Sequence, residues 1–336
     1  MRNVLAVAIC GAVLASVGGC DRGSDSKPGG GKQLAIAVIP KGATHEFWLS
    51  VKAGAERAGK ELGVRIDWIG PEKEDDRSQQ IALVENMILK GVDGIVLAPL
   101  DRKALMSPVA KAKGAGIPVV VIDSALDGND WVSFVATDNY KGGQLGGQRS
   151  VELTGGKGKA VMLRYQENSA STEAREAGWL DEIKKCPDIQ VLSQEQRAGA
   201  TKESAQTASE NLLNRFTKDG KLECDLIFCP NESSAYGMLM ALQNKRLGGK
   251  VKYVGFDASK ALIVGLATGE IHGLVLQNPE KMGYLGVKTM VERLQGRKVD
   301  RRVDTGVTLI TADDLAKPET KALVPQIDEW LKDVKK

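Results

Sequence analysis

Residues 34–69 read LAIAVIPKGATHEFWLSVKAGAERAGKELGVRIDWI and contain one complete strand–helix–strand unit. The run 34–39 is apolar throughout and rich in Ala, Ile and Val, which predicts a strand that is buried on both faces. Residues 47–62 then carry apolar side chains at helical spacing, and a second strand is expected at 64–69. Strands buried on both faces form parallel sheets that helices cover from either side.

The same alternation continues through the chain and divides it into two similar halves. Gly63, Gly91, Gly116 and Gly220 are expected to end helices, because glycine readily adopts the left-handed conformation of a helix C-cap. Two α/β lobes are the economical interpretation. Further strands are expected at 94–98, 119–122, 133–137, 160–165, 189–193, 226–229 and 251–256, and further helices at 78–90, 103–114, 172–185, 202–216, 233–246 and 259–267.

The first 32 residues predict export. Arg2 supplies a basic start, residues 4–17 are almost wholly apolar or small, and the segment ends VGGC at 17–20, so 1–19 is expected to be a signal peptide. This ending resembles the lipobox of bacterial lipoproteins, which implies lipidation of Cys20; the alternative is an ordinary signal with a chance cysteine. Residues 20–32 would then be a lipid-anchored flexible linker. We expect a periplasmic or otherwise extracytoplasmic protein, tethered to a membrane.

Composition argues against nucleic-acid binding, metal binding and catalysis. The formal net charge is +3, and cleavage of the predicted signal peptide, which contains Arg2, leaves +2. No basic block of the kind that binds nucleic acid is present. The chain has no P-loop, GxGxxG, GxSxG or HExxH motif and no zinc-like Cys/His spacing, so no cofactor is expected. The sequence leaves undecided whether Cys186 and Cys224 form a disulfide, whereas Cys229 is expected to be buried and unpaired.

Polar side chains follow the predicted strands in both halves, where an open α/β sheet binds its ligand. Any one of them could instead cap a helix, but together they suit a neutral, hydroxylated ligand. Phe47 and Trp48 could stack on the C–H face of a sugar ring, or pack the first helix onto the sheet. The polar residues at strand ends are Lys41, Asp123, Ser124, Thr137, Asp138, Tyr165, Gln166, Asn231, Glu232, Asp257, Gln277 and Asn278.

These residues, in this order, resemble the periplasmic ribose-binding protein family, the sugar receptors of ATP-binding-cassette (ABC) importers. The resemblance covers about residues 33–311 and implies the type I periplasmic binding protein fold, two Rossmann-like parallel-sheet lobes joined by a three-segment hinge. The N-terminal lobe would comprise 33–137 plus 278–306, and the C-terminal lobe 138–277 plus 307–336. The tail beyond 311 is expected to form a surface helix over 324–334.

The resemblance also implies ligand contacts, through the motifs KGATHEFW at 41–48, VID at 121–123, TDN at 137–139, ARE at 174–176, FCPNE at 228–232, GFD at 255–257 and LQNP at 276–279. Phe47 and Trp48 fall on the stacking aromatics, Asp123 on the acid that binds two hydroxyls, and Arg175 on a guanidinium clamp. The implied ligand-binding residues are Lys41, His45, Phe47, Trp48, Asp123, Thr137, Arg175, Asn231, Phe256, Asp257 and Gln277.

Departures from the family bear on the identity of the ligand. Ser124 replaces the Arg that usually follows the Asp, and no aromatic residue lies near 197–200. Lys41 and His45 add basic groups at the mouth of the cleft. We expect Lys41 to be a solvated lysine at the rim, with an acidic or phosphorylated sugar as the alternative.

The resemblance implies a monomeric binding protein and no enzymatic activity. It would capture a sugar or polyol between its lobes by hinge closure and deliver it to the membrane permease of an ABC importer. The first alternative is a sensor that presents the sugar to a chemoreceptor or a histidine kinase. A repressor of the lac type would need an N-terminal DNA-binding headpiece, where this chain has a signal and a linker. An extracellular enzyme would use Asp123, Asp257 and His45 as acid and base.

Overall fold

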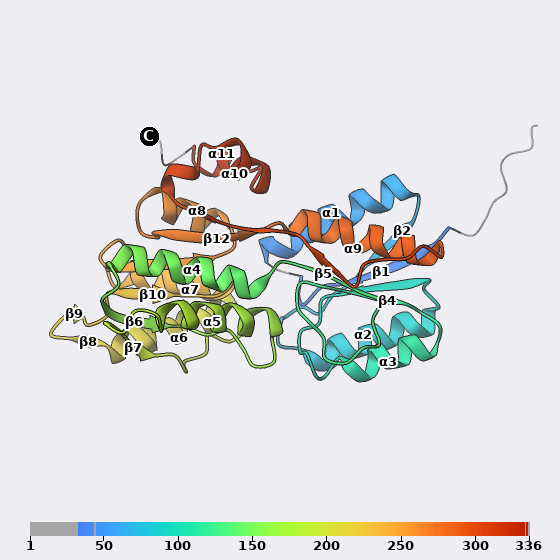
Figure 1. Cartoon of the computed structure of the whole chain (residues 1–336), viewed down its shortest axis with the longest axis horizontal. Coiled ribbons are helices and arrows are strands. Elements are labelled where there is room, and N and C mark those ends of the chain that lie inside the picture. The colour runs from blue at the N-terminus through green and yellow to red at the C-terminus, as the bar shows by residue number, and fades with distance from the viewer. Residues whose placement is uncertain (1–32, 44, 333, 335–336) are drawn as a thin grey trace, which may run out of the picture. The chain divides into compact units, whose positions relative to one another are not determined.

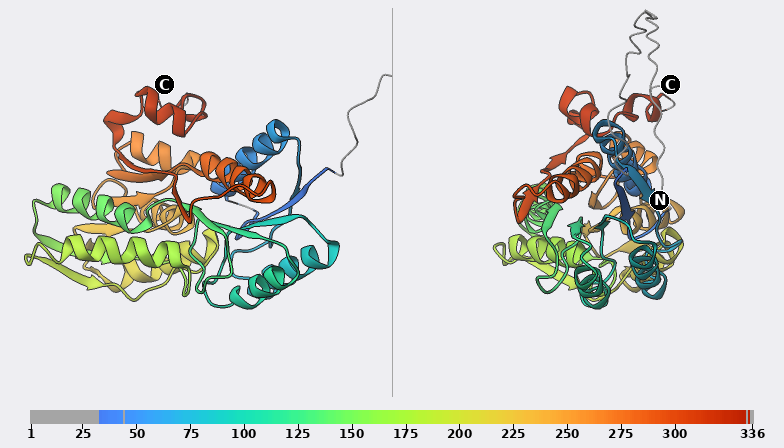
Figure 2. Two further views of the ribbon diagram at one scale, coloured as in Figure 1. Left: turned by 45° about the vertical axis from the view of Figure 1, so that its right-hand side comes forward. Right: turned by 90° about the vertical axis from the view of Figure 1, so that its right-hand side faces the viewer.

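The computed structural model describes residues 33–43, 45–332 and 334. Figures 1 and 2 show the elements of this part of the chain from three directions. The predicted signal peptide, the linker and Cys20 lie outside the described residues. The described part contains two six-stranded sheets and a two-stranded hairpin, and each large sheet with its covering helices is called a lobe below.

The first lobe is built on a fully parallel sheet with the strand order β13-β5-β4-β3-β1-β2. Helices α1 (Glu46–Leu62) and α9 (Pro279–Leu294) pack on one face of this sheet. Helices α2 (Arg77–Lys90) and α3 (Met106–Gly114) pack on the other face. The strands are β1 (Ala35–Ile39), β2 (Arg65–Trp68), β3 (Gly94–Leu97), β4 (Val119–Ile122), β5 (Ser133–Ala136) and β13 (Arg302–Asp304).

The second lobe repeats this plan with the order β14-β12-β11-β10-β6-β7, in which β14 runs antiparallel to β12. Helices α4 (Asn139–Thr154) and α5 (Ala170–Ile183) cover one face. The other face carries α6 (Lys202–Arg215), α7 (Glu232–Asn244) and α8 (Lys260–Ala267). The strands are β6 (Gly158–Met162), β7 (Ile189–Ser193), β10 (Leu226–Phe228), β11 (Lys252–Phe256), β12 (Gly273–Gln277) and β14 (Val307–Ile310), with the hairpin β8 (Thr217–Lys218) and β9 (Lys221–Leu222).

The chain passes between the two sheets three times. Helix α4 follows β5 of the first sheet but packs on the second, and α9 follows β12 of the second sheet but packs on the first. Strands β13 and β14 are close in sequence, yet they are edge strands of different sheets. The predicted α/β fold with two parallel-sheet lobes joined by three segments is therefore confirmed, and the segments lie at 136–139, 277–279 and 304–307 (Figure 1).

Some predicted strands and helix ends agree with the structure and others differ from it. The strands expected at 119–122 and 189–193 are β4 and β7 without alteration. The strand expected at 160–165 begins earlier and ends at Met162, because its register with β7 shifts after Ala160 and leaves Arg164 in an isolated bridge. Gly220 does not end a helix: it has a φ of 72° and lies in the turn of the β8–β9 hairpin.

The expectation of a surface helix over 324–334 is wrong. Helix α10 (Pro318–Leu323) ends two residues before Pro325, and α11 (Ile327–Trp330) is a single turn. Ile327 is fully buried in the core of the second lobe, near α8. The tail is therefore packed onto this lobe, because its apolar residues face the core.

Helix α4 fills an interval where no helix is expected from the sequence. Its glycines lower helix propensity by about 1 kcal/mol each, but the packing of the helix requires them. A Cβ added at Gly143 would lie 2.0 Å from the backbone oxygen of Arg175 in α5. This close approach of two helices outweighs the local propensity. A Cβ added at Gly147 would likewise meet α5, at Glu182, whereas at Gly142 and Gly146 it would meet the rings of Phe256 and Phe228 in the sheet.

The three cysteines in the described part of the chain are free thiols. Cys229 is buried at the end of β10, as predicted. Cys186 and Cys224 precede β7 and β10, and β6 lies between those strands, so a bridge would have to reach across it. Burial raises the pKa of both Cys224 and Cys229 to about 12, which keeps them protonated at neutral pH.

Replacement of Gly143 by alanine tests the contact between α4 and α5. We expect Gly143→Ala to lower the free energy of unfolding by about 2–3 kcal/mol, because the new methyl group overpacks against a backbone carbonyl. Urea titration followed by circular dichroism measures this change. Gly114→Ala is the matched control: Gly114 is an exposed helical glycine with nothing within 4 Å of an added Cβ, and its effect should stay within about 0.5 kcal/mol. Equal stability of the two variants would contradict the packing argument.

Candidate functional site

The carboxyl ends of strands from both sheets meet at one polar cavity. Its volume is about 30 Å³, enough for one or two water molecules. A wider groove of about 430 Å³ lies beside it against the C-terminal tail, but the charged side chains gather in the smaller cavity. The cavity brings together the predicted residues Lys41, His45, Phe47, Trp48, Asp123, Arg175, Asn231, Asp257 and Gln277, and adds Glu74, Tyr165, Ser171, Thr172 and Glu232.

Two aspartates occupy corresponding positions in the two lobes. Asp123 directly follows β4, and Asp257 directly follows β11, the third strand of each sheet in the orders given above. Both have left-handed backbones, with φ of 61° and 68°. Aspartate adopts this conformation more readily than most residues, although it is sparsely populated. The two sharp turns place one carboxylate from each lobe at the cavity, and strain of this kind is common at functional sites.

Lys41 is buried beside Asp123. Its Nζ lies 2.8 Å from Asp123 Oδ2, and it donates hydrogen bonds to the hydroxyls of Ser169 and Ser171 at 3.3 and 3.1 Å. The expectation of a solvated rim lysine is therefore wrong, since Lys41 is only 3% exposed. A buried carboxylate requires a counter-charge. Lys41 supplies a cation next to Asp123, where Ser124 has replaced the arginine of the resembled family.

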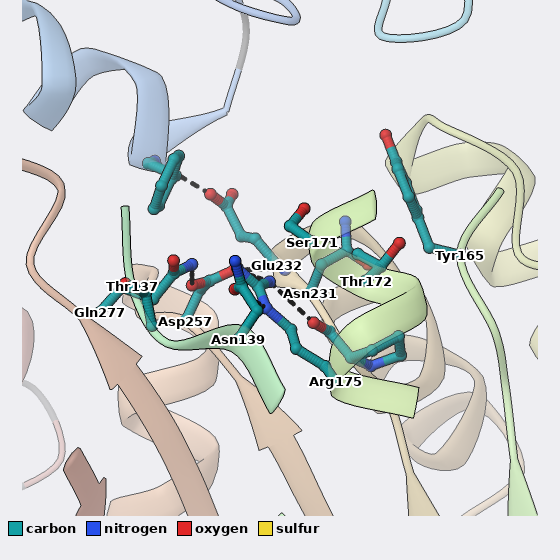
Figure 3. Close-up of polar contacts among 12 residues, drawn as sticks. Thr137, Asn139, Tyr165, Ser171, Thr172, Arg175, Asn231, Glu232, Asp257 and Gln277 are labelled. Carbon is teal, nitrogen blue, oxygen red and sulfur yellow. Dashed lines mark hydrogen bonds and ion pairs between the residues drawn. The ribbon is translucent and has the colours of Figure 1, made fainter. Parts of the chain in front are cut away.

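Arg175 is held from several sides. Its Nε donates to Asn139 Oδ1 at 2.8 Å, and its Nη1 donates to the carbonyl of Pro230 at 2.9 Å. Its guanidinium stacks 4.1 Å above the ring of Phe256. Phe256 therefore lies in the core beneath Arg175 and does not line the cavity. Figure 3 shows Arg175, Asp257 and Gln277 pointing toward one another.

Asp257 is buried between Gln277 and Arg175. Gln277 Nε2 donates to Asp257 Oδ1 at 2.7 Å, and Arg175 Nη1 lies 3.9 Å from Asp257 Oδ2. Burial raises the pKa of Asp257 to about 6, although the nearby guanidinium opposes this shift. Arg175 Nη2 and Gln277 Oε1 are buried without a hydrogen-bond partner in the described part of the chain. A hydroxyl group both donates and accepts, so it could satisfy one donor and one acceptor of this kind.

The aromatic wall comes from the first turn of α1. Phe47 and Trp48 are both buried, with ring centroids 4.9 Å apart and planes at 89°. They pack against the core of the first lobe and also line the cavity. Both interpretations of this pair offered by the sequence are therefore compatible with its position.

Glu74 is a cavity residue that the sequence did not suggest. It lies between β2 and α2 in the charged run EKEDD, a pattern typical of an exposed loop, yet it is only 6% exposed. Its carboxylate accepts hydrogen bonds from Trp48 Nε1 and from the Tyr165 hydroxyl, each at 2.6 Å, and pairs with His45 Nδ1. Burial alone would lower the pKa of His45, but the Glu74 carboxylate raises it to about 9; the reciprocal attraction lowers the pKa of Glu74 to about 2 against its own burial.

The other cavity residues differ in the signal that the sequence carries for them. Tyr165 and Glu232 stand in the polar strand-end pattern of the sequence, whereas Ser171 and Thr172 are ordinary residues at the start of α5 with no such signal. Thr137, a predicted ligand contact, does not line the cavity and lies in a segment between the sheets. Its hydroxyl is 3.3 Å from the Thr305 hydroxyl and donates to the Gly306 carbonyl at 3.4 Å.

Residues 33–43, 45–332 and 334 contain neither a metal-binding cluster nor a membrane-spanning helix. Among them, no cluster of three or more His, Cys, Asp or Glu side chains is arranged to hold a metal ion. No helix among them has the length and apolarity needed to span a bilayer.

Comparisons with known proteins agree with this architecture. Residues 36–298 match the family model described as a periplasmic binding protein domain. The D-allose-binding periplasmic protein of Escherichia coli is 31% identical over 78% of this chain and 85% of its own length.

Solved structures give the same result. A carbohydrate transporter solute-binding protein from Agrobacterium radiobacter, in complex with D-arabinose, superposes with a TM-score of 0.82 at 32% identity, covering 87% of this chain and 99% of that one. An ABC transporter solute-binding protein from Agrobacterium vitis with bound D-fucose gives a TM-score of 0.80 at 33% identity, covering 85% and 98%. With two matching sheets, three crossing segments and a family model that spans most of its length, the chain belongs to the periplasmic binding protein family.

Proposed function

We propose that this protein is the solute-binding component of an ABC importer and that it binds a neutral sugar or polyol between its lobes. One observation carries this proposal. The buried donor Arg175 Nη2 and acceptor Gln277 Oε1 lack partners in the described part of the chain, and they adjoin two aspartates and an aromatic wall. Hydroxyl groups and C–H faces occur together in sugars, so this combination suits them. Binding and release by this site need no catalytic step.

The charge balance of the site supports a neutral ligand. Among the described residues, every cation at the site stands beside a carboxylate, which leaves none to neutralise a phosphate or a sugar acid. D-allose, D-arabinose and D-fucose, named for the related proteins, are all neutral sugars. This argues against the acidic or phosphorylated sugar that the basic residues of the sequence left open. The pairs are Lys41–Asp123, His45–Glu74, Arg175–Asp257 and Lys202–Glu232.

Ligand entry would require the lobes to separate. The cavity of about 30 Å³ is far smaller than the roughly 300–1,000 Å³ of ordinary small-molecule sites. A hinge motion about the three crossing segments would open it, and a ligand that touches both lobes would stabilise the closed arrangement. In this proposal the lobes comprise 33–137 plus 278–306 and 138–277 plus 307–336. A monomer in the closed form would then present its ligand to the membrane permease.

We further propose that lipid on Cys20 tethers the protein to a membrane. The support is the sequence of residues 1–32 alone: a basic start, a short apolar core, a cysteine after small residues and a polar linker. Several acyl chains on one cysteine hold a protein far more firmly than a single chain.

Palmitate labelling in cells tests the lipid anchor. Cys20→Ala is expected to abolish incorporation of labelled palmitate, because it removes the thiol that would carry the acyl group. Cys10→Ala, which removes a cysteine inside the signal peptide, should leave labelling intact. Undiminished label in Cys20→Ala would refute lipidation at this residue.

A thermal-shift screen over pentoses, hexoses, polyols, sugar acids and sugar phosphates tests the proposed function, and calorimetry then gives the affinity. Asp123→Asn should weaken binding of the selected sugar about tenfold or more, because the amide replaces a charged acceptor in the same left-handed conformation. Asp219→Asn is the matched control, since Asp219 also has a positive φ, of 48°, but lies exposed in the β8–β9 turn. Stabilisation by anionic sugars alone would contradict a neutral ligand, and equal affinity of both variants would contradict the site.

The raised pKa of Asp257 predicts how affinity depends on pH. With a pKa of about 6, Asp257 is a carboxylate at pH 7.5 and is protonated at pH 5, so affinity should fall as the pH decreases through 6. A neutral acceptor contributes about 1 kcal/mol less than a charged one, which corresponds to about a fivefold loss of affinity. His45 and Glu74 titrate near 9 and 2, outside this window. Calorimetry of Asp257→Asn should show a flat profile; an unchanged slope would assign the titration to another group.

A further inference from the structure

Two buried carboxylates, one from each lobe, accept hydrogen bonds from the opposite lobe. Glu74 of the first lobe accepts from the hydroxyl of Tyr165 in the second lobe at 2.6 Å. Glu232 of the second lobe accepts from the backbone N–H of Phe47 in the first lobe at 3.1 Å. These reciprocal contacts, Glu74–Tyr165 and Glu232–Phe47, are called the interlobe latch below. Both join the lobes through protein atoms alone.

Contacts within the first lobe fix the orientation of the Glu74 carboxylate. Trp48 Nε1 and His45 Nδ1 occupy one side of its carboxylate, and Tyr165 occupies the other oxygen, Oε2. Gln166 of the second lobe adds a hydrogen bond to the Glu74 backbone carbonyl at 2.8 Å. The polar atoms of Glu74 and Tyr165 are therefore used by each other and by their neighbours. They border the cavity, but few of their hydrogen-bond donors and acceptors are left for a ligand.

Glu232 completes a helix that belongs to the other lobe. The N-cap residue of α1 is His45, and its side chain makes no capping hydrogen bond within the described residues. The first backbone N–H groups of a helix have no partner inside the helix and favour negative charge. Glu232 Oε2 fills this role for Phe47, while Lys202 Nζ lies 3.0 Å from the other carboxylate oxygen. Separation of the lobes would leave α1 without this cap.

We propose that the interlobe latch keeps a substantial fraction of the ligand-free molecules in the closed form. Glu74, Tyr165 and Glu232 then act as positioning residues that set ligand affinity. Only the affinity part of this inference rests on the proposed function. The apparent dissociation constant varies inversely with the fraction of molecules in the binding-competent form. Loss of one charge-assisted hydrogen bond shifts the ratio of closed to open forms about tenfold. If the two forms are equally populated in the parent, affinity falls about fivefold.

Tyr165→Phe removes only the latch hydroxyl, and Tyr140→Phe is its matched control. The Tyr140 hydroxyl also donates to a carboxylate, Asp181, at 2.8 Å, but both residues lie in the second lobe. Small-angle X-ray scattering of the ligand-free protein should give a larger radius of gyration for Tyr165→Phe than for the parent, and an unchanged radius for Tyr140→Phe. An unchanged radius in Tyr165→Phe would overturn the proposal. This readout needs no ligand, so it stands even if no sugar binds and the proposed function fails.

A double-mutant cycle separates the latch from direct contact with the ligand. Tyr165→Phe should weaken sugar binding about fivefold in the parent background and have little further effect in Glu74→Gln, because the two side chains act as one unit. An equal loss of affinity in both backgrounds would show that Tyr165 contacts the ligand independently, and would overturn its role as a positioning residue.

Discussion

Four buried carboxylates around the cavity, each beside a cation, form the centre of this molecule, and the packing of both lobes serves to bring these partners together. A charge removed from water is tolerated only beside an opposite charge or several hydrogen bonds. Lys41 therefore lies against Asp123, and Arg175 faces Asp257. The partners come from segments far apart in the chain, so each pair depends on a correctly formed sheet. The cleft is consequently polar, balanced in charge and nearly filled by its own side chains.

Close backbone packing places these charges. Gly143 lets α4 approach the turn of α5 that carries Arg175, and the guanidinium then reaches over Phe256. Left-handed turns at Asp123 and Asp257 bring both carboxylates to the carboxyl ends of their sheets. The second lobe repeats the arrangement of the first. Because of this repetition, each lobe contributes one acid to the cavity.

The departures from the resembled family become intelligible in the folded chain. Serine follows Asp123 where the family has arginine, and the missing charge comes from Lys41 at the end of β1. His45, the second added basic residue, pairs with Glu74, a residue from a charged loop. A comparison of one sequence motif at a time shows only that a residue of the family is missing. The compensating residues lie in other segments and become visible only when the strands are assembled.

The sequence by itself determined the class of fold and most element positions, because strand periodicity and the polar residues after each strand are local features. Nine of the ligand-binding residues implied by the resemblance to the family line the cavity, and two of them, His45 and Arg175, follow from that resemblance alone. The sequence did not reveal α4, whose glycines oppose a helix locally and are required by close contacts with α5 and with Phe228 and Phe256 of the second sheet. Nor did it reveal that Lys41 and Glu74 are buried, since a charged residue in a loop usually faces water. Tertiary structure decided these points, because the burial of a charge depends on a partner that another part of the chain supplies.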